Sequence, residues 1–198
     1  MTDPRTDPVA HLRRDLEFEA ELPGGHYRFA TTWGLFSPRG IDDGSKLLLR
    51  HVEVAPDADC LDLGCGYGVL GVVLARLAPH GHTTLADKDF VAVEYARRNL
   101  ALNGLANGEA LLSNGFDALR ERRFDVIVAN LPAKVGKELL TIYLHDALAT
   151  LRPGGALWMV TVTGLRRFIE RMSKEVFDDY DKVKQGPHYT VAVTRKPG

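Results

Sequence analysis

The stretch "DCLDLGCGYGVLGVVLARLA", residues 59–78, decides the fold of this chain. It opens with a short apolar run that predicts a buried strand, and it closes with apolar spacing that predicts a helix. Four glycines, at positions 64, 66, 68 and 71, stand between them. Glycines at such a turn let the backbone bend tightly and approach a ligand, to which the helix offers free N–H groups. We therefore expect a ligand-binding turn here.

Strand and helix patterns go on alternating toward the C-terminus. Further strands are predicted at 82–87, 109–114, 124–130, 154–162, 180–185 and 188–196, and further helices at 90–104, 137–151 and 165–177. Continuous Val/Ile/Leu runs between helices indicate a mainly parallel sheet covered on both faces. The last two runs surround Gly186-Pro187, so the last strand should return antiparallel. We expect an α/β, Rossmann-like doubly wound fold with a mainly parallel seven-stranded sheet.

The N-terminal part has a different pattern. Residues 16–33, "LEFEAELPGGHYRFATTW", alternate apolar and polar residues around Pro23-Gly24-Gly25, which predicts a β-hairpin. A Gly/Ser/Asp-rich loop and an apolar helix from about Lys46 follow. We expect a flexible tail over 1–10, a hairpin with a capping loop and helix over 11–50, and the main domain over 51–198.

Composition excludes several classes of protein. No apolar run is long enough to span a bilayer. The spacing typical of metal ligands is absent from the two cysteines, Cys60 and Cys65, and from the seven histidines. We expect a soluble cytoplasmic protein, a monomer or homodimer, with no metal and no membrane partner. The net charge of −1 argues against tight nonspecific nucleic-acid binding. Arginine pairs such as Arg166-Arg167 should lie mostly on solvated helix faces, with a phosphate-binding surface as the alternative.

Two acids narrow the choice of ligand for the glycine turn. Spacing of the last three glycines fits the dinucleotide pattern G-x-G-x-x-G, and Asp87, which ends the second strand, could hold a ribose. Asp62, however, places negative charge two residues before the first glycine. That charge disfavours a pyrophosphate and favours S-adenosylmethionine, which carries a sulfonium and an ammonium. A dinucleotide-dependent oxidoreductase is therefore the weaker alternative.

The run from Asp62 to Gly68, "DLGCGYG", resembles the cofactor loop of class I S-adenosylmethionine-dependent methyltransferases, and the resemblance covers roughly residues 20–195. It implies that residues 51–198 form the cofactor-binding methyltransferase domain. For the methionine part of the cofactor, it implies contacts with Asp62 and with the loop backbone at Gly64, Cys65, Gly66 and Gly68. For the ribose it implies Asp87. For the adenine it implies Lys88 beside the ring and Asn114, Gly115 and Phe116 at its edge and face.

The fourth strand ends in "FDVIVANLPAKVG", residues 124–136. Residues 130–133, Asn-Leu-Pro-Ala, resemble in part the signature Asn-Pro-Pro-aromatic, which follows the fourth strand in enzymes that methylate planar nitrogens. These nitrogens are the exocyclic amines of adenine and guanine and the amide of glutamine. The resemblance implies that Asn130 and Pro132 are catalytic and that Asn130 also lies against the cofactor. Leu131 replaces the first proline and Ala133 replaces the aromatic residue that would stack on the target. A strand that merely ends in a turn is the structural alternative.

The segment 29–49, "FATTWGLFSPRGIDDGSKLLL", resembles the one that folds over the cofactor and target pockets in small-subunit rRNA guanine-N2 methyltransferases. It implies target or capping roles for Trp33, Gly34, Phe36, Ser37 and Asp42, with packing of the hairpin as the alternative. The larger ribosomal enzymes carry a further N-terminal domain to which nothing in this sequence corresponds, so their RNA substrate does not transfer automatically.

The expected function is S-adenosylmethionine-dependent N-methylation, with the exocyclic amine of guanine in rRNA or other RNA as the acceptor. One alternative is a small-molecule or protein-amide N-methyltransferase. The other is a cofactor-binding or RNA-binding accessory protein without transferase activity.

Overall fold

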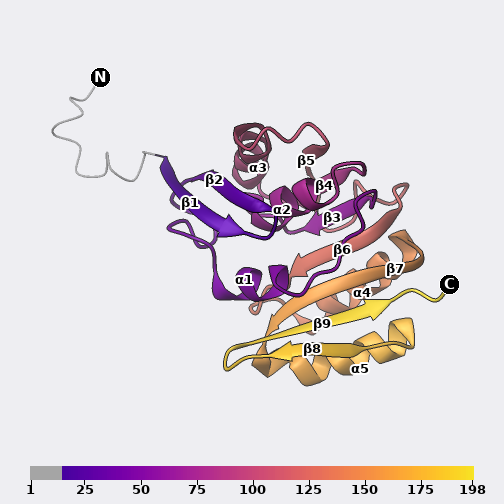
Figure 1. Ribbon diagram of the computed structural model, residues 1–198. Helices are drawn as coiled ribbons and strands as arrows, with labels where there is room; N and C mark the ends of the chain where they lie inside the picture. The colour runs from indigo at the N-terminus through magenta and orange to yellow at the C-terminus, as the bar shows by residue number, and fades with distance from the viewer. Residues whose placement is uncertain (1–14) are drawn as a thin grey trace, which may run out of the picture.

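The computed structural model describes residues 15–198 and contains two sheets (Figure 1). Seven strands form the main sheet in the order β5-β4-β3-β6-β7-β9-β8, and β1 pairs with β2 in a separate hairpin. The tail expected over residues 1–10 lies outside the described residues. The seven-stranded, mainly parallel sheet and the N-terminal hairpin are confirmed.

The strands are β1 (Leu16–Leu22), β2 (Gly25–Thr31), β3 (Cys60–Leu63), β4 (Thr83–Asp87), β5 (Gly108–Leu112), β6 (Phe124–Asn130), β7 (Leu151–Val162), β8 (Asp181–Gln185) and β9 (Tyr189–Arg195). The α-helices are α1 (Asp43–Leu49), α2 (Val69–Leu77), α3 (Phe90–Leu102), α4 (Lys137–Thr150) and α5 (Arg166–Phe177), and a 3-10 turn, η2 (Thr163–Leu165), precedes α5.

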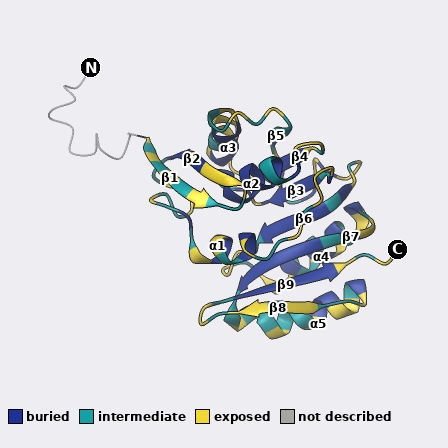
Figure 2. Ribbon diagram, viewed as in Figure 1, coloured by how far each residue is buried: buried dark blue, intermediate teal, exposed yellow. Residues whose placement is uncertain are grey.

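Both faces of the central strands are buried, as Figure 2 shows in dark blue for β3, β6 and β7. Successive residues of β6 point to opposite faces: Val126 and Val128 pack with α1, α2 and α3, whereas Ile127 and Ala129 pack with α4 and α5. This explains why the strand reads as an unbroken apolar run rather than as an alternating one.

The far end of the sheet is antiparallel. β9 pairs antiparallel with β7 and with the edge strand β8. β7 begins at Leu151, where the sequence predicted the end of a helix, because Leu151 pairs with Phe124 of β6. Arg152 fixes this start by bonding Asp59 at 2.8 Å and Asp125 at 2.7 Å.

The hairpin is attached to the main domain by a buried amide. Asn99 of α3 accepts a hydrogen bond from the Ala30 N–H at 2.7 Å, and its Nδ2 donates to the carbonyls of Ala30 and Tyr67. Phe18 and Phe29 of the hairpin pack around the Tyr67 ring. The hairpin therefore shares one core with α2 and α3, and the boundary expected at residues 50 and 51 remains a proposal.

Candidate functional site

The glycine loop between β3 and α2 lies where the carboxyl ends of β3, β4 and β6 meet, the usual ligand position in open parallel sheets. Gly64 and Gly66 have φ of +71° and +54°, and a Cβ on either would meet nothing within 4 Å. A Cβ on Gly68 or Gly71 would instead meet Leu85 at 2.9 or 2.3 Å. The first two glycines thus leave space for a ligand, and the last two allow close packing of α2 on β4.

Asp62 lies beneath this loop, where it is 1% exposed. Its Oδ2 accepts the Gly71 N–H at 2.7 Å, and its buried Oδ1 has no partner among the described residues. Burial raises the pKa of Asp62 to about 7; the nearby Asp87 carboxylate adds to the rise, and the Gly71 bond opposes it. A positively charged ligand nearby would favour the ionised form of this carboxyl.

Asp87 is half-buried at the end of β4. It accepts the Gly66 N–H at 2.9 Å on Oδ2 and the Asp89 N–H at 3.0 Å on Oδ1. Because a carboxylate has about four acceptor positions, two remain for a ligand. Lys88 is exposed beside it. Cys65 is buried, which raises the pKa of its thiol well above its usual value, so only its backbone is available to a ligand.

The loop after β5 contributes backbone rather than an aromatic face. Asn114 is exposed, but the Phe116 side chain is 2% exposed and packs edge-to-face with Tyr143 at 6.4 Å. A ligand here could meet only the Phe116 main chain. Tyr143 of α4 also confines Gly115, whose φ is +58° and whose Cβ would lie 2.8 Å from the ring. Helical spacing alone gave no reason to single out Tyr143.

Asn130 has its side chain held in one orientation. Its Nδ2 donates to Asp42 Oδ1 at 3.0 Å and to Ser45 Oγ at 3.1 Å. A carboxylate accepts hydrogen bonds and does not donate them, so the NH2 end of the amide must face Asp42. No hydrogen bond from a described residue reaches Asn130 Oδ1. The half-buried amide therefore leaves its carbonyl oxygen unpaired.

Asp42 also caps α1, since its Oδ1 accepts the Ser45 N–H at 2.9 Å. The helix consequently begins at Asp43, three residues before the expected start. Both partners of Asn130 thus belong to the first turn of one short helix, and α1 packs on β7 and β9 of the main sheet.

The capping loop, residues 32–42, joins the hairpin to α1 and is bound to the glycine loop. The Tyr67 hydroxyl lies 3.1 Å from the Gly40 carbonyl and 3.4 Å from the Ser37 carbonyl. Within the loop, Phe36 is 66% exposed and Gly34 has a φ of +99°. Trp33 is half-buried, with the Arg39 guanidinium 4.8 Å from the centre of its ring. Phe36 is therefore the aromatic side chain of this loop that is free to meet a target.

Leu131 follows Asn130 for a structural reason. Its N–H donates to the Val160 carbonyl of β7 at 3.0 Å, and its side chain is 7% exposed. A proline here would lose that bond and that burial. The Leu131 carbonyl accepts no hydrogen bond from a described residue, and Pro132 and Ala133 are exposed beyond it. The end of β6 therefore offers two oxygens without a partner among the described residues: the side-chain Oδ1 of Asn130 and the main-chain carbonyl oxygen of Leu131.

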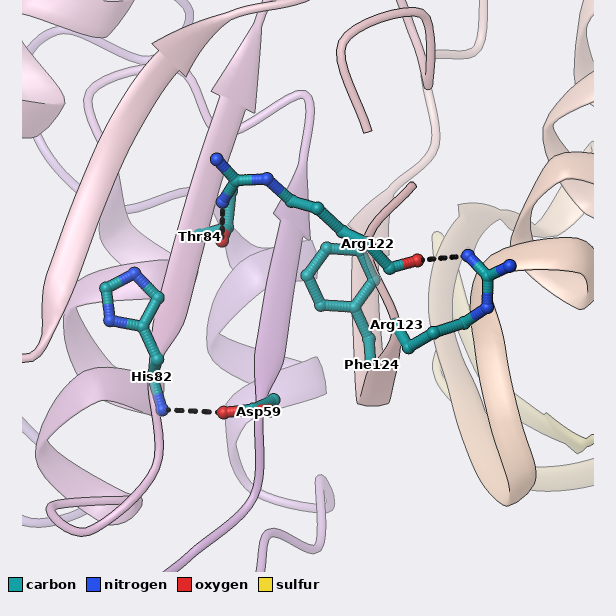
Figure 3. A pocket seen from close by; sticks show the side chains of 6 residues that line it. All are labelled: Asp59, His82, Thr84, Arg122, Arg123 and Phe124. Atoms are coloured by element: carbon teal, nitrogen blue, oxygen red, sulfur yellow. Dashed lines mark hydrogen bonds between the residues drawn. The ribbon is translucent and has the colours of Figure 1, made fainter. Parts of the chain in front are cut away.

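A depression lies at the other end of the parallel strands, near the amino ends of β3, β4 and β6 (Figure 3). Its lining consists of Asp59, His82, Thr84, Arg122, Arg123 and Phe124. Arg122 is already bonded to Glu109 and to Thr84, and none of the residues implied by the resemblance lies there. This depression is separate from the glycine loop and Asn130.

Within residues 15–198, no group of three or more His, Cys, Asp or Glu side chains is placed to hold a metal ion. The same part of the chain has no helix that combines the length and apolarity needed to cross a membrane.

The strand order, the glycine loop and the acid ending β4 define the class I methyltransferase fold. The chain belongs to the methyltransferase small domain family, whose profile matches residues 26–193. This confirms the resemblance seen in the sequence.

The relatives include ribosomal RNA methyltransferases. Ribosomal RNA small subunit methyltransferase C of Pseudomonas putida is 35% identical over 169 residues, or 82% of this chain and 49% of that protein. The Pseudomonas aeruginosa protein of the same name is 38% identical over 75% of this chain and 46% of its own length. A Thermus thermophilus 16S rRNA N2 methyltransferase, in complex with AdoMet and guanosine, superposes with a TM-score of 0.83 at 32% identity, covering 92% of this chain and 50% of that one. The chain spans about half the length of these relatives.

Proposed function

We propose that this protein transfers a methyl group from S-adenosylmethionine to the exocyclic amine of guanine in rRNA or another RNA. The observation that carries the proposal is the fixed orientation of Asn130, whose NH2 faces Asp42 and whose Oδ1 is unpaired. An acceptor-only oxygen at the end of β6 suits a substrate group that carries N–H donors. The Thermus thermophilus relative, a 16S rRNA N2 methyltransferase solved with guanosine, supports the choice among such groups.

The residues present fit this cofactor. Gly64 and Gly66 leave open space above the loop, and Asp87 keeps two acceptor positions for ribose hydroxyls. The buried, unpartnered oxygen of Asp62 favours a cationic ligand. When bound, the cofactor supplies an electrophilic methyl group. Lys88, Asn114 and the main chain at Phe116 would border its adenine.

At the acceptor, the chain's contribution is to position one nitrogen. The lone pair of an exocyclic amine is delocalised into the ring, so the nitrogen is a weak nucleophile. Asn130 Oδ1 and the Leu131 carbonyl would each accept one of its N–H bonds, which aims the nitrogen and stabilises positive charge developing on it. Pro132, which has no N–H, would help to hold the chain direction after Leu131. Both N–H groups must be free, so the guanine must be unpaired.

Stacking on the target base has to come from outside the β6 loop, because Ala133 has no ring. Phe36 is the exposed aromatic residue of the capping loop. Base stacking on an aromatic side chain contributes about 1–3 kcal/mol per base. We assign this contact to Phe36, with Gly34 and Ser37 shaping the loop that carries it.

A protein-amide acceptor is the second candidate, and Ala133 is the observation that favours it. The amide of glutamine presents the same two N–H donors as guanine but has no ring to be stacked. The rRNA assignment additionally predicts a cytoplasmic location.

Transfer of a labelled methyl group decides between these acceptors. Labelled cofactor is incubated with the protein and RNA, protein or small-molecule pools from cells that lack the chain. Label should enter RNA as N2-methylguanine. Label in protein alone would overturn the RNA proposal in favour of the amide, and cofactor binding without label in any pool would support a nonenzymatic role.

Asn130→Ala is the matching variant. It should reduce transfer to a small residual rate and leave cofactor affinity within a fewfold, because the Asn130 side chain bonds only Asp42 and Ser45 within the described chain. Turnover retained by this variant at the wild-type rate would refute the assigned role of the amide.

A further inference from the structure

Exposed cations gather beside the acceptor end of the sheet, although the whole chain has a net charge of −1. They come from the loop after β6, from the first turn of α4 and from the first two turns of α5. The set, which we call the basic edge, consists of Lys134, Lys137, Arg166, Arg167 and Arg171, of which all but the half-buried Arg166 are exposed.

Contacts place three members of the basic edge, and Lys134 and Arg167 are near them in sequence, in the loop before α4 and in the first turn of α5. Lys137 Nζ and the Arg171 guanidinium lie 5.5 and 5.8 Å from the centre of the same ring, that of Phe168. Arg166 donates to the Gln185 side chain at the end of β8 at 3.1 Å. The cations of α4 and α5 therefore form one continuous surface rather than two separate helix faces.

The members of the basic edge make no direct ion pair with a described carboxylate. Among residues 15–198, no carboxylate oxygen lies within 4.0 Å of a side-chain nitrogen of any of its members. Three acids lie within four residues of a member, namely Glu138, Glu170 and Glu175. Glu170 is bonded to Lys174 at 2.9 Å, and Lys174 and the more distant Arg166 both lower its pKa. Most other arginines of the described chain have carboxylate partners, as Arg98 and Arg152 do.

Two helix N-termini add to the positive potential. α4 and α5 begin just after the carboxyl ends of β6 and β7, and neither first turn has a side-chain cap. The first N–H groups of α4 and the positive ends of both dipoles point toward the same edge, although the first turn of α4 also carries Glu138 and the Arg166 N–H of α5 already donates to the Thr163 carbonyl. Phosphate oxygens are the groups that such N–H groups and cations bind in common.

The basic edge is also continuous with the acceptor site. Lys134 stands four residues after Asn130 in the same exposed loop, and Leu131 bonds Val160 of β7, the strand that leads through η2 into α5. A polymer whose base reaches Asn130 would have its neighbouring backbone within reach of these cations. In Figure 1 the arrowheads of β6, β7 and β8 point to this one end.

We infer that the basic edge binds the phosphate backbone of a single-stranded RNA segment on the side of the target nucleotide that faces α4 and α5. This inference rests on the proposed function, because it takes an unpaired guanine at Asn130 as its starting point. Each phosphate that a cation neutralises releases condensed counterions, so salt weakens binding in proportion to the number of contacts.

The salt dependence of RNA binding tests whether the basic edge binds phosphates. The probe is a short unstructured RNA with one guanine, and the logarithm of its affinity is followed against the logarithm of salt concentration. The slope should become shallower by about 0.7 for Arg167→Gln and by about 1.4 for Lys134→Gln combined with Arg167→Gln. The matched control is Arg123→Gln, an exposed arginine without a carboxylate partner at the opposite edge (Figure 3). Its slope should equal that of the wild type.

Methyl transfer separates failure of the basic edge from failure of the proposed function. The basic-edge variants should raise KM for RNA and leave kcat at saturating RNA and cofactor affinity unchanged. If the wild type methylates RNA but both basic-edge variants have its slope and KM, the basic edge is wrong and the function stands. If the wild type neither binds nor methylates RNA while labelling another acceptor, both are wrong.

Discussion

Replacing Asp42 should disorient Asn130 and slow methyl transfer without affecting cofactor binding. Asp42 Oδ1 receives the Asn130 Nδ2 bond at 3.0 Å, and Asp42→Ala removes that acceptor. Ser45 Oγ then remains, but a hydroxyl can donate as well as accept, so it no longer dictates which end of the amide faces the target. The flipped amide would present N–H groups to the substrate amine instead of an oxygen.

The magnitude follows from the bond that is lost. A hydrogen bond to a charged group contributes about 1.5–3 kcal/mol, so the amide orientation is maintained by a factor of about 10 to 150. The kcat of Asp42→Ala should fall by about twofold if the two amide orientations become equally populated, and by at most the factor in that range if the flipped amide becomes the preferred form. Ser45→Ala removes a neutral acceptor worth about 0.5–1.5 kcal/mol and should cost at most about 2- to 12-fold, because Asp42 still faces the NH2 end of the amide. Asp42→Asn keeps an acceptor oxygen and a helix cap, so it should lie closer to the wild type than Asp42→Ala.

The assay is single-turnover transfer at saturating cofactor and RNA, measured in a double-mutant cycle with Asn130→Ala. If Asp42 acts through the amide, Asp42→Ala should slow the wild type and have no further effect on the residual rate of Asn130→Ala. Loss of the α1 cap also costs about 0.5–2 kcal/mol of stability, which thermal unfolding measures separately. An equal rate loss in both backgrounds would refute the reasoning.

Three further predictions concern the cofactor and the target. Asp87→Ala should weaken cofactor affinity at least tenfold in calorimetry, because two charge-assisted hydrogen bonds of about 1.5–3 kcal/mol each are lost. Phe36→Ala should raise KM for RNA by about 5- to 150-fold and leave cofactor affinity unchanged; Phe90→Ala, at another exposed ring, is its control. Cofactor affinity should rise about tenfold from about pH 6 to about pH 8, since ionised Asp62 favours the cation and its pKa is about 7. Asp62→Asn should bind more weakly and lose this pH dependence.

The sequence predicted the sheet, and it led to a candidate site at the carboxyl ends of the strands, because both depend on patterns along the chain. Unbroken apolar runs between helices indicate buried parallel strands, and glycines after the first of these mark the ligand turn. Asn130 could be singled out because it ends such a run. These are local signals, and the fold preserves them.

Side-chain direction was beyond what the sequence could supply. Asp62 proved to lie beneath the glycine loop, and the Phe116 ring proved to be buried against Tyr143. The contact between Asp42 and Asn130 joins residues 88 positions apart, so it exists only once α1 has packed on the sheet. Leu131 looked like a departure from a signature, yet its N–H and side chain are both used by the fold.

The bond from Tyr67 to the capping loop limits how freely this fold can be re-engineered. Tyr67 belongs to the glycine loop, but its hydroxyl meets main-chain oxygens at positions 37 and 40. The segment that would select the acceptor is therefore not a detachable module. A loop transplanted from another enzyme to change specificity would have to bring carbonyls to the same hydroxyl, or be accompanied by a new residue 67 whose ring still fills the space beside Phe18 and Phe29.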